Sequence, residues 1–387
     1  MSMDKFADIR PYNDDEVAEV IASIIADNEF ISAVRWLKFP RIPAFFNFIL
    51  FPLLRFVIKR QVRGVNTVAD FQGRLSDYMD HMISISVNQL TISGLEKLKA
   101  DEAYLFVSNH RDITLDPAFV NYALYHKFAH TVRIAIGDNL LTKDFATKLM
   151  RVNKSFIVKR SETAPRKILA TLKHLSEYIA HSLKEDGQSV WIAQREGRAK
   201  NGLDRTDPAI IKMFAINEGR GENFGAFIKS LNIVPVAVSY EYDPCDAMKA
   251  RELYEVATNG SYEKAEHEDI ESIAKGISGF KGNVHLSFCE MLDQELDDAD
   301  AVAGWIDKQI IDHYVLHPSN YFAYEKLYGE FPEGVYSNKR LPFNAPAMSK
   351  EKRLFEERLA QIPEAYREYM LQAYANPIIS KREFALK

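Results

Sequence analysis

The most informative segment of this chain is Phe106-Val107-Ser108-Asn109-His110-Arg111-Asp112-Ile113-Thr114-Leu115-Asp116-Pro117. The apolar run over residues 103–107 predicts a buried strand that stops at a small polar turn. A helical pattern then starts at Asp116, a good N-cap, and Pro117, a favoured first helical residue. We therefore expect His110 just past the end of a strand, where open α/β sheets carry their chemistry.

The turn contains groups suited to general base chemistry. A neutral His held by a carboxylate can take a proton from a hydroxyl as that hydroxyl attacks a carbonyl. Two carboxylates are near His110 in the sequence, Asp112 two residues later and Asp116 six residues later. The residues alone leave the partner of His110 open between them, and an ordinary surface His in a turn is the plainer alternative.

Composition limits the classes of protein that this chain can represent. The 387 residues allow one large domain with additions or two smaller domains, and 47% apolar residues can bury a sizeable core. A net charge of −5 argues against nucleic acid as the main partner. Cys245 and Cys289 form no disulfide framework, which favours a reducing compartment, and the polar, acidic first residues predict no signal peptide. The 24 Phe and 18 Tyr residues are typical of a protein that handles lipid, although large cores also use Phe.

Strand and helix patterns alternate through the middle of the chain. Strands are predicted at 84–93, 103–107, 132–136, 156–158, 189–193, 233–239 and 284–288. Helices are predicted between them at 117–126, 143–150, 165–183 and 208–217, with a last one at 299–316. This alternation predicts an α/β fold with a largely parallel mixed sheet covered by helices. We expect three regions: a helical N-terminal region (1–83), an α/β domain (84–317) and a helical C-terminal extension (318–387) with one strong helix at 349–374.

Residues 42–58 are the most apolar part of the N-terminal region. Residues 42–54 carry no charge, and basic residues flank them: Lys38, Arg41, Arg55, Lys59, Arg60 and Arg63. The stretch is shorter than the roughly 20 apolar residues that cross a bilayer. Taken alone, the stretch is more simply a core or hairpin helix; the other reading is a segment in the membrane interface with basic residues toward lipid headgroups. Pro43 and Pro52 predict a broken or angled segment.

Two further strand ends carry charged groups. Residues 155–161, Ser-Phe-Ile-Val-Lys-Arg-Ser, place Arg160 where it could bind a phosphate through two parallel hydrogen bonds. Residues 190–198, Val-Trp-Ile-Ala-Gln-Arg-Glu-Gly-Arg, end a buried strand in Glu196, Gly197 and Arg198. Gly197 allows a positive φ or a close approach of the backbone to a ligand. Solvated basic turns are the plainer interpretation of each.

Pro235 stands inside an apolar run, Asn232-Ile233-Val234-Pro235-Val236-Ala237-Val238. Proline is disfavoured within a buried strand unless the strand is at an edge or a bulge. Pro235 therefore marks either a special position in the sheet or a plain edge strand.

Taken in order, these four segments resemble motifs I to IV of the glycerolipid acyltransferases, the family of glycerol-3-phosphate and lysophosphatidic acid acyltransferases. The resemblance covers residues 108–238, about a third of the chain. Motif I of the family carries Asn-His with an Asp five residues after the His, whereas Asp116 is six residues after His110. Asp-Pro-Ala also occurs in plastid-type members, which favours Asp116. In motif III, Gln194-Arg195 replaces the usual Phe-Pro.

The resemblance implies an enzyme that moves a fatty acyl group from a thioester to a hydroxyl. The donor would be acyl-CoA or acyl carrier protein, and the acceptor a glycerol phosphate or lysophospholipid, foremost 1-acyl-sn-glycerol-3-phosphate. His110 would be the general base, oriented by Asp116, while Arg160, Glu196, Gly197 and Arg198 would bind the acceptor. No cofactor or metal ion is expected. The alternatives are a non-catalytic lipid-binding member of the same fold and an acyl-thioester hydrolase. We expect a peripheral, monotopic protein on the cytoplasmic face of a bacterial inner membrane.

Overall fold

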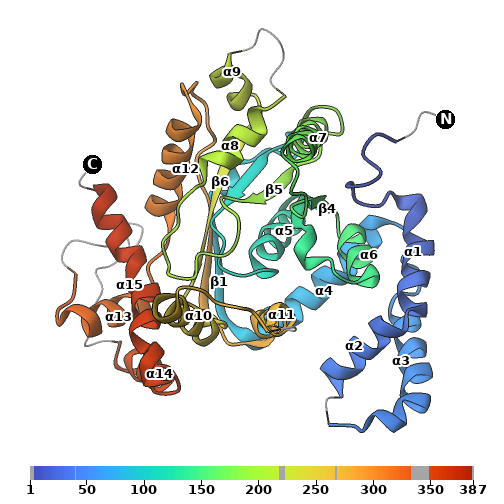
Figure 1. Cartoon of the computed structure of the whole chain (residues 1–387), viewed down its shortest axis with the longest axis horizontal. Helices are drawn as coiled ribbons and strands as arrows, with labels where there is room; N and C mark the ends of the chain where they lie inside the picture. The colour runs from blue at the N-terminus through green and yellow to red at the C-terminus, as the bar shows by residue number, and fades with distance from the viewer. Residues whose placement is uncertain (1–3, 40, 218–222, 266–267, 333–347, 386–387) are drawn as a thin grey trace.

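The computed structural model describes residues 4–39, 41–217, 223–265, 268–332 and 348–385 (Figure 1). Its core is a seven-stranded sheet with the strand order β1-β7-β6-β2-β5-β3-β4. The strands are β1 (Val87–Ser93), β2 (Leu105–Ser108), β3 (Arg133–Gly137), β4 (Ser155–Val158), β5 (Val190–Ala193), β6 (Ile233–Tyr240) and β7 (Gly282–Phe288). β6 and β7 are antiparallel, and all other pairs are parallel. The predicted α/β class with a largely parallel mixed sheet is confirmed.

Helices cover both faces of the sheet, as the alternation of elements predicts. α4 and α5 pack on one face, and α7, α8, α9 and α12 pack on the other. The α-helices are α1 (Asp14–Ala26), α2 (Asn28–Lys38), α3 (Asn47–Gln61), α4 (Val68–Ser86), α5 (Leu115–Phe128), α6 (Asp144–Val152), α7 (Pro165–Lys184), α8 (Pro208–Ala215), α9 (Phe224–Lys229), α10 (Asp246–Asn259), α11 (Glu268–Ser278), α12 (Ala299–His313), α13 (Pro318–Tyr328), α14 (Ser349–Ala360) and α15 (Glu364–Ala385). Short 3₁₀ turns are η1 (Ala44–Phe46), η2 (Leu95–Lys97) and η3 (Asp138–Leu140).

The central strand β2 positions the polar turn that follows it. Leu105, Phe106 and Val107 are fully buried. Leu105 and Val107 pack toward α7 and α8, whereas Phe106 packs toward α4 and α5, because successive side chains of a strand point to opposite faces. Burial on both faces is the normal environment of a parallel sheet. β2 therefore delivers Asn109 and His110 to the carboxyl edge of the sheet from its middle.

Pro235 lies in an interior strand, so the edge-strand reading of residues 232–238 is wrong. β6 pairs with β2 on one side and with β7 on the other. The Pro235 carbonyl accepts a hydrogen bond from the Cys289 N–H at 2.9 Å, just beyond the last residue of β7. Proline has no backbone N–H to donate, but Pro235 lies opposite Cys289, beyond the last residue of β7. The sheet therefore tolerates a proline at this position.

Three helical predictions need correction. Thr114, not Asp116, is the N-cap of α5, which begins at Leu115. The single helix predicted at 349–374 is two helices, α14 and α15, separated at Pro363, which disfavours a helical residue before it. α10 and α11 were not predicted. α10 buries only Asp246, Lys249 and Ala250, so its sequence carries little apolar periodicity.

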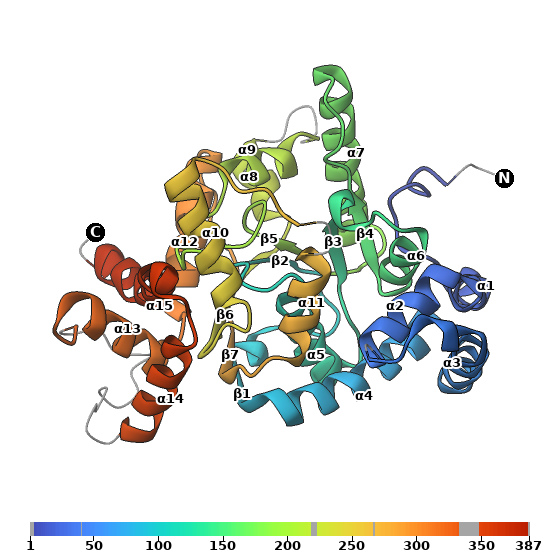
Figure 2. The same cartoon turned by 60° about the horizontal axis from the view of Figure 1, so that its bottom comes forward.

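The terminal helices lie on opposite sides of the sheet domain. Figures 1 and 2 both show α1, α2 and α3 beside α6, and α13, α14 and α15 on the far side of the sheet. Residues 42–58 form η1 and most of α3, and the α-helix runs on through Pro52, so the predicted break reduces to the 3₁₀ turn. No helix within the described residues is long and apolar enough to cross a membrane. The boundaries at residues 83 and 317 stay a prediction.

Candidate active site

His110 and Asp116 meet in the turn between β2 and α5. The Nδ1 atom of His110 lies 2.9 Å from Oδ2 of Asp116. The Asp116 side chain is fully buried, whereas 14% of the His110 side chain is exposed. The Trp191 ring on β5 meets the imidazole edge to face, with 6.0 Å between ring centroids. A buried carboxylate thus holds one imidazole nitrogen, and the ring keeps a partly exposed face.

The Asp116 carboxylate has hydrogen bonds on both oxygens. Its Oδ2 accepts from the backbone N–H groups of Arg111 and Asp112, at 2.6 and 2.9 Å. Its Oδ1 accepts from the Tyr240 hydroxyl at 2.8 Å. Such a set of donors stabilises a buried negative charge and fixes the direction of the carboxylate. Asp116 lies in the first turn of α5, where the helix dipole also favours an anion.

Asp112, the rival partner of His110 in the sequence, faces away from the imidazole. Its Oδ1 accepts from the backbone N–H groups of Thr114 and Leu115, at 2.9 and 2.8 Å. Asp112 therefore satisfies the free N–H groups at the start of α5. The sequence had predicted Asp116 in this capping role. Burial, with the nearby Asp116 charge, raises the pKa of Asp112. On its other side, Oδ2 leaves no room for a side chain at Gly276, so α11 packs directly on this carboxyl group.

A buried polar network holds the turn to neighbouring strands and loops. Asn109 donates to the Val238 carbonyl oxygen at 3.0 Å and accepts from the Val238 N–H at 2.8 Å, which ties the turn to β6. Arg111 donates to Asp204 at 2.6 Å. Burial alone would lower the pKa of Arg111, but the charge and hydrogen bond of Asp204, together with Tyr314 and Asp243, outweigh burial and raise that pKa. Lys249 of α10 donates to the Arg111 carbonyl oxygen at 2.6 Å.

The structure brings two of the predicted acceptor-binding residues together. Arg160 follows β4, Glu196 follows β5, and their side chains form an ion pair at 3.0 Å. Both side chains are exposed, Arg160 by 36% and Glu196 by 73%. The Arg160 backbone N–H donates to Asp138 at 3.1 Å, which fixes the loop that carries it. β2, β4 and β5 run in the same direction in the sheet, so their carboxyl ends share one edge and the pair lies at the same edge as His110.

Gly197 and Arg198 lie in the same loop but behave differently. Gly197 has φ of 71°, the positive value that the sequence allowed for. Arg198 turns toward α11 and donates to the Ser272 hydroxyl at 2.8 Å. The next residue, Ala199, donates its N–H to the His110 carbonyl oxygen at 2.8 Å. Arg198 therefore does not join the Arg160–Glu196 pair, although its loop is tied to the His110 turn.

Sequence reasoning missed Tyr240, Asp204 and Lys249. Each contacts the turn from a position far along the chain, and no local motif marks it. Only Tyr240 carried a usable signal, because it extends the predicted strand at 233–239 by one residue to the functional edge of the sheet. Within the described part of the chain, no group of three or more His, Cys, Asp or Glu side chains could hold a metal ion.

Comparisons with known proteins address the family. The crystal structure of the 1-acyl-sn-glycerophosphate (LPA) acyltransferase PlsC from Thermotoga maritima is similar, at 13% identity and a TM-score of 0.36, over 76% of this chain and 94% of that one. A search of curated proteins found no match. Residues 89–239 match the family model described as Acyltransferase, and this span contains all four motifs. Residues 89–239 are therefore similar to acyltransferase domains.

Proposed function

We propose that the protein is an O-acyltransferase that moves a fatty acyl group from acyl-CoA or an acyl carrier protein to the hydroxyl of a glycerol phosphate or lysophospholipid. The foremost acceptor is 1-acyl-sn-glycerol-3-phosphate, and the reaction serves phospholipid biosynthesis or remodelling. The observation that carries the proposal is the His110–Asp116 pair, held at 2.9 Å at the carboxyl edge of the acyltransferase domain.

His110 acts as the general base in this mechanism. Asp116 accepts the Nδ1–H hydrogen bond, so Nε2 is the nitrogen that is free to accept a proton. The acceptor hydroxyl gives its proton to Nε2 while its oxygen bonds to the thioester carbonyl carbon. The buried Asp116 carboxylate stabilises the imidazolium that forms. When the tetrahedral intermediate collapses, the C–S bond breaks and the leaving thiolate takes the proton back from His110.

Arg160 and Glu196 bind the acceptor in this proposal. Their exposed ion pair contributes little on its own, because water screens it. A phosphate can replace Glu196 on the Arg160 guanidinium with two parallel hydrogen bonds, and the released Glu196 can orient the acceptor hydroxyl. Gly197 lets the backbone of this loop approach the ligand, and Arg198 supplies further positive charge once it leaves Ser272.

We also propose that η1 and α3 dock the enzyme on a membrane surface as a peripheral protein, on the cytoplasmic face. Large apolar side chains of these elements are exposed by 39–72%: Phe45, Phe46, Phe48, Ile49, Leu53, Phe56 and Val57. Lys38, Arg41, Lys59, Arg60 and Arg63 around them are exposed too. An apolar surface bordered by cations is typical of interfacial helices on anionic lipid. Arg55 is the exception, because it donates to the carbonyl oxygens of Ile25 and Ala26 instead.

A panel of acceptors tests the proposal. Purified protein is incubated with labelled palmitoyl-CoA, or with palmitoyl acyl carrier protein, and with glycerol-3-phosphate, 1-acyl-sn-glycerol-3-phosphate or a neutral lysolipid. We expect acyl transfer to a phosphate-bearing acceptor. The Arg160→Met variant should raise KM for that acceptor and leave residual transfer to a neutral lysolipid unchanged. Thioester loss without acylated acceptor would indicate a hydrolase, and lipid binding without turnover would indicate a non-catalytic protein.

A further inference from the structure

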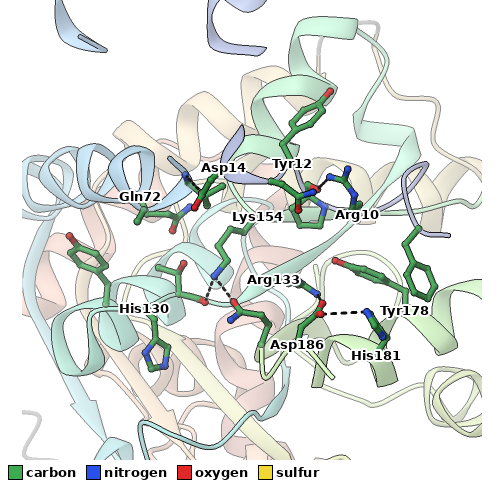
Figure 3. Close-up of a pocket in the computed structure, with 18 of the residues that line it drawn as sticks. Arg10, Tyr12, Asp14, Gln72, His130, Arg133, Lys154, Tyr178, His181 and Asp186 are labelled. Atoms are coloured by element: carbon green, nitrogen blue, oxygen red, sulfur yellow. Dashed lines mark hydrogen bonds and ion pairs between the residues drawn. The ribbon is translucent and has the colours of Figure 1, made fainter. Parts of the chain in front are cut away.

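A cavity lies at the amino edge of the sheet, opposite the edge that carries His110. Its volume is about 620 Å³, within the range of small-molecule sites. Arg133 opens β3 and Lys154 immediately precedes β4, so both enter the cavity from the starts of strands. The facing wall is the N-terminal segment that leads into α1, including Arg10, Tyr12 and Asp14 (Figure 3).

Two arginines of the cavity are neutralised by carboxylates. Arg10 forms an ion pair with Glu16 at 2.6 Å and another with Asp4. Arg133 forms an ion pair with Asp186 at 2.6 Å, and His181 lies 3.4 Å from the same carboxylate. These ion pairs neutralise the charges of Arg10 and Arg133, so neither arginine requires a further anion for charge balance.

Lys154 is different because its hydrogen-bond partners are neutral. Its Nζ donates to the Thr131 carbonyl oxygen at 2.8 Å and to Gln188 Oε1 at 2.9 Å. An ammonium has three N–H donors, so one is left for another acceptor. Asp14, the nearby carboxylate, accepts from the Val68 N–H, and no described carboxylate comes within ion-pair distance of Lys154. Burial, helped by Arg133, lowers the pKa of Lys154 to about 8.

Tyr178 supplies a second group without a partner. Its side chain is buried, with 2% of the residue exposed, and its hydroxyl has no hydrogen-bond partner among the described residues. The neighbouring Ser182 hydroxyl is engaged, because it donates to the Tyr178 carbonyl oxygen and accepts from Arg133. Arg133 lies over the Tyr178 ring at 5.5 Å, and Figure 3 shows the hydroxyl directed toward Arg133 and the cavity. A buried hydroxyl without a partner costs roughly 1–3 kcal/mol, so a ligand atom that accepts from it would recover part of this cost.

The backbone of Lys154 is also in a costly conformation. Its φ of 59° is left-handed, a region that Gly or Asn usually occupies and that costs other residues roughly 1–2 kcal/mol. This conformation closes the turn between α6 and β4. Strain retained at a lysine whose side chain lines a cavity is a further sign of a binding site.

We propose that this cavity binds a small organic anion whose carboxylate or phosphate group accepts hydrogen bonds from Lys154, Tyr178 and Arg133. Phe6, Pro11 and Val68 line the cavity and offer apolar contacts to the rest of such a ligand. The site is separate from the acceptor site, since the two lie at opposite edges of the sheet. A ligand bound here joins the N-terminal segment, and through it α1, to the sheet domain.

Calorimetric titration of the full chain tests this site with phenyl phosphate, benzoate and the neutral benzyl alcohol. We expect at least one anion to bind and the alcohol not to bind, and the better anion identifies the ligand as a phosphate or a carboxylate. Lys154→Met and Tyr178→Phe should each weaken binding by about tenfold or more. All titrations use an Arg160→Met background, so that the acceptor site at the other edge does not contribute phosphate binding. Lys148→Met, on α6 outside the cavity, should leave binding unchanged.

Tyr178→Phe keeps the test informative if Lys154→Met does not fold, because losing an unpartnered hydroxyl should not destabilise the protein. Failure of both anions to bind at roughly 10 mM would overturn the proposal. Binding that survives in both Lys154→Met and Tyr178→Phe would overturn it as well. Neither result depends on whether the protein transfers acyl groups.

Discussion

The Tyr240 hydroxyl donates a 2.8 Å hydrogen bond to Oδ1 of Asp116, on the oxygen opposite the one that His110 contacts. The two residues are 124 positions apart, and the contact joins the end of β6 to the first turn of α5. Burial, and then the adjacent Asp116 charge, raises the pKa of Tyr240, so the hydroxyl stays a donor. Tyr240 is therefore a positioning residue for the proposed general base.

Replacing Tyr240 with Phe should lower kcat by about ten- to a hundredfold, the effect of losing one hydrogen bond to a buried, charged carboxylate. KM for the acceptor should not change, because Tyr240 lies behind Asp116. The measurement is a steady-state titration of the acceptor. Tyr242→Phe is the matched control, a buried tyrosine just past β6 that has no hydrogen bond to Asp116. Equal kcat values for wild type and Tyr240→Phe would remove Tyr240 from the mechanism.

Asparagine substitutions separate the roles of Asp116 and Asp112. Asp116→Asn removes the charge that orients His110, and we expect a rate loss on the order of 10³- to 10⁴-fold. Asp112→Asn should cost less than about tenfold, because its Oδ1 can still accept from Thr114 and Leu115. Transfer rates of the two variants at saturating substrate decide the point. A larger loss in Asp112→Asn would make Asp112 the partner of His110 during catalysis.

The proposed membrane surface makes a separate prediction about vesicles. A variant with Phe45, Phe48 and Phe56 all replaced by Ser should bind anionic vesicles at least about tenfold more weakly, because three exposed aromatic rings are lost. Co-sedimentation with vesicles containing phosphatidylglycerol measures this. The control variant carries Ile168→Ser and Leu169→Ser, which remove exposed apolar groups on α7 instead. Equal binding by the triple variant and wild type would contradict docking through η1 and α3.

Acid should destabilise the protein through His317. Burial, with a smaller contribution from His285, lowers the pKa of His317 to about 4, against an ordinary value of 6.5. His317 is neutral in both states above pH 6.5. As the pH falls from 6.5 to 4 only the unfolded chain takes up the proton, so roughly 3 kcal/mol of folding free energy is lost.

Urea unfolding of wild type and His317→Asn, at pH 7 and at pH 4.5, measures this loss. Asn is a good N-cap for α13 and does not titrate, so the variant should lose less stability between the two pH values. The same loss in both proteins would show that His317 does not titrate as its burial requires.

The sequence predicted the parts of the molecule that follow from local pattern. The apolar runs before His110, Arg160 and Glu196 are strands in the structure, and parallel pairing brings their ends to one edge. The contact between His110 and Asp116 was one of two options, because the chain alone does not show which carboxylate caps α5. The contacts of Tyr240 and Asp204 could not be predicted, since each residue meets the turn only after the chain has folded. The orientation of the Arg198 side chain could not be predicted either. It depends on a contact with α11, and no helix was predicted there.

The most direct test of the account is the rate of acyl transfer to 1-acyl-sn-glycerol-3-phosphate by His110→Ala. His126→Ala, at an exposed histidine of α5, serves as the control. The account predicts that His110→Ala loses at least about 10³-fold in kcat while His126→Ala keeps wild-type activity. Wild-type transfer rates in a correctly folded His110→Ala would contradict a mechanism in which His110 is the general base.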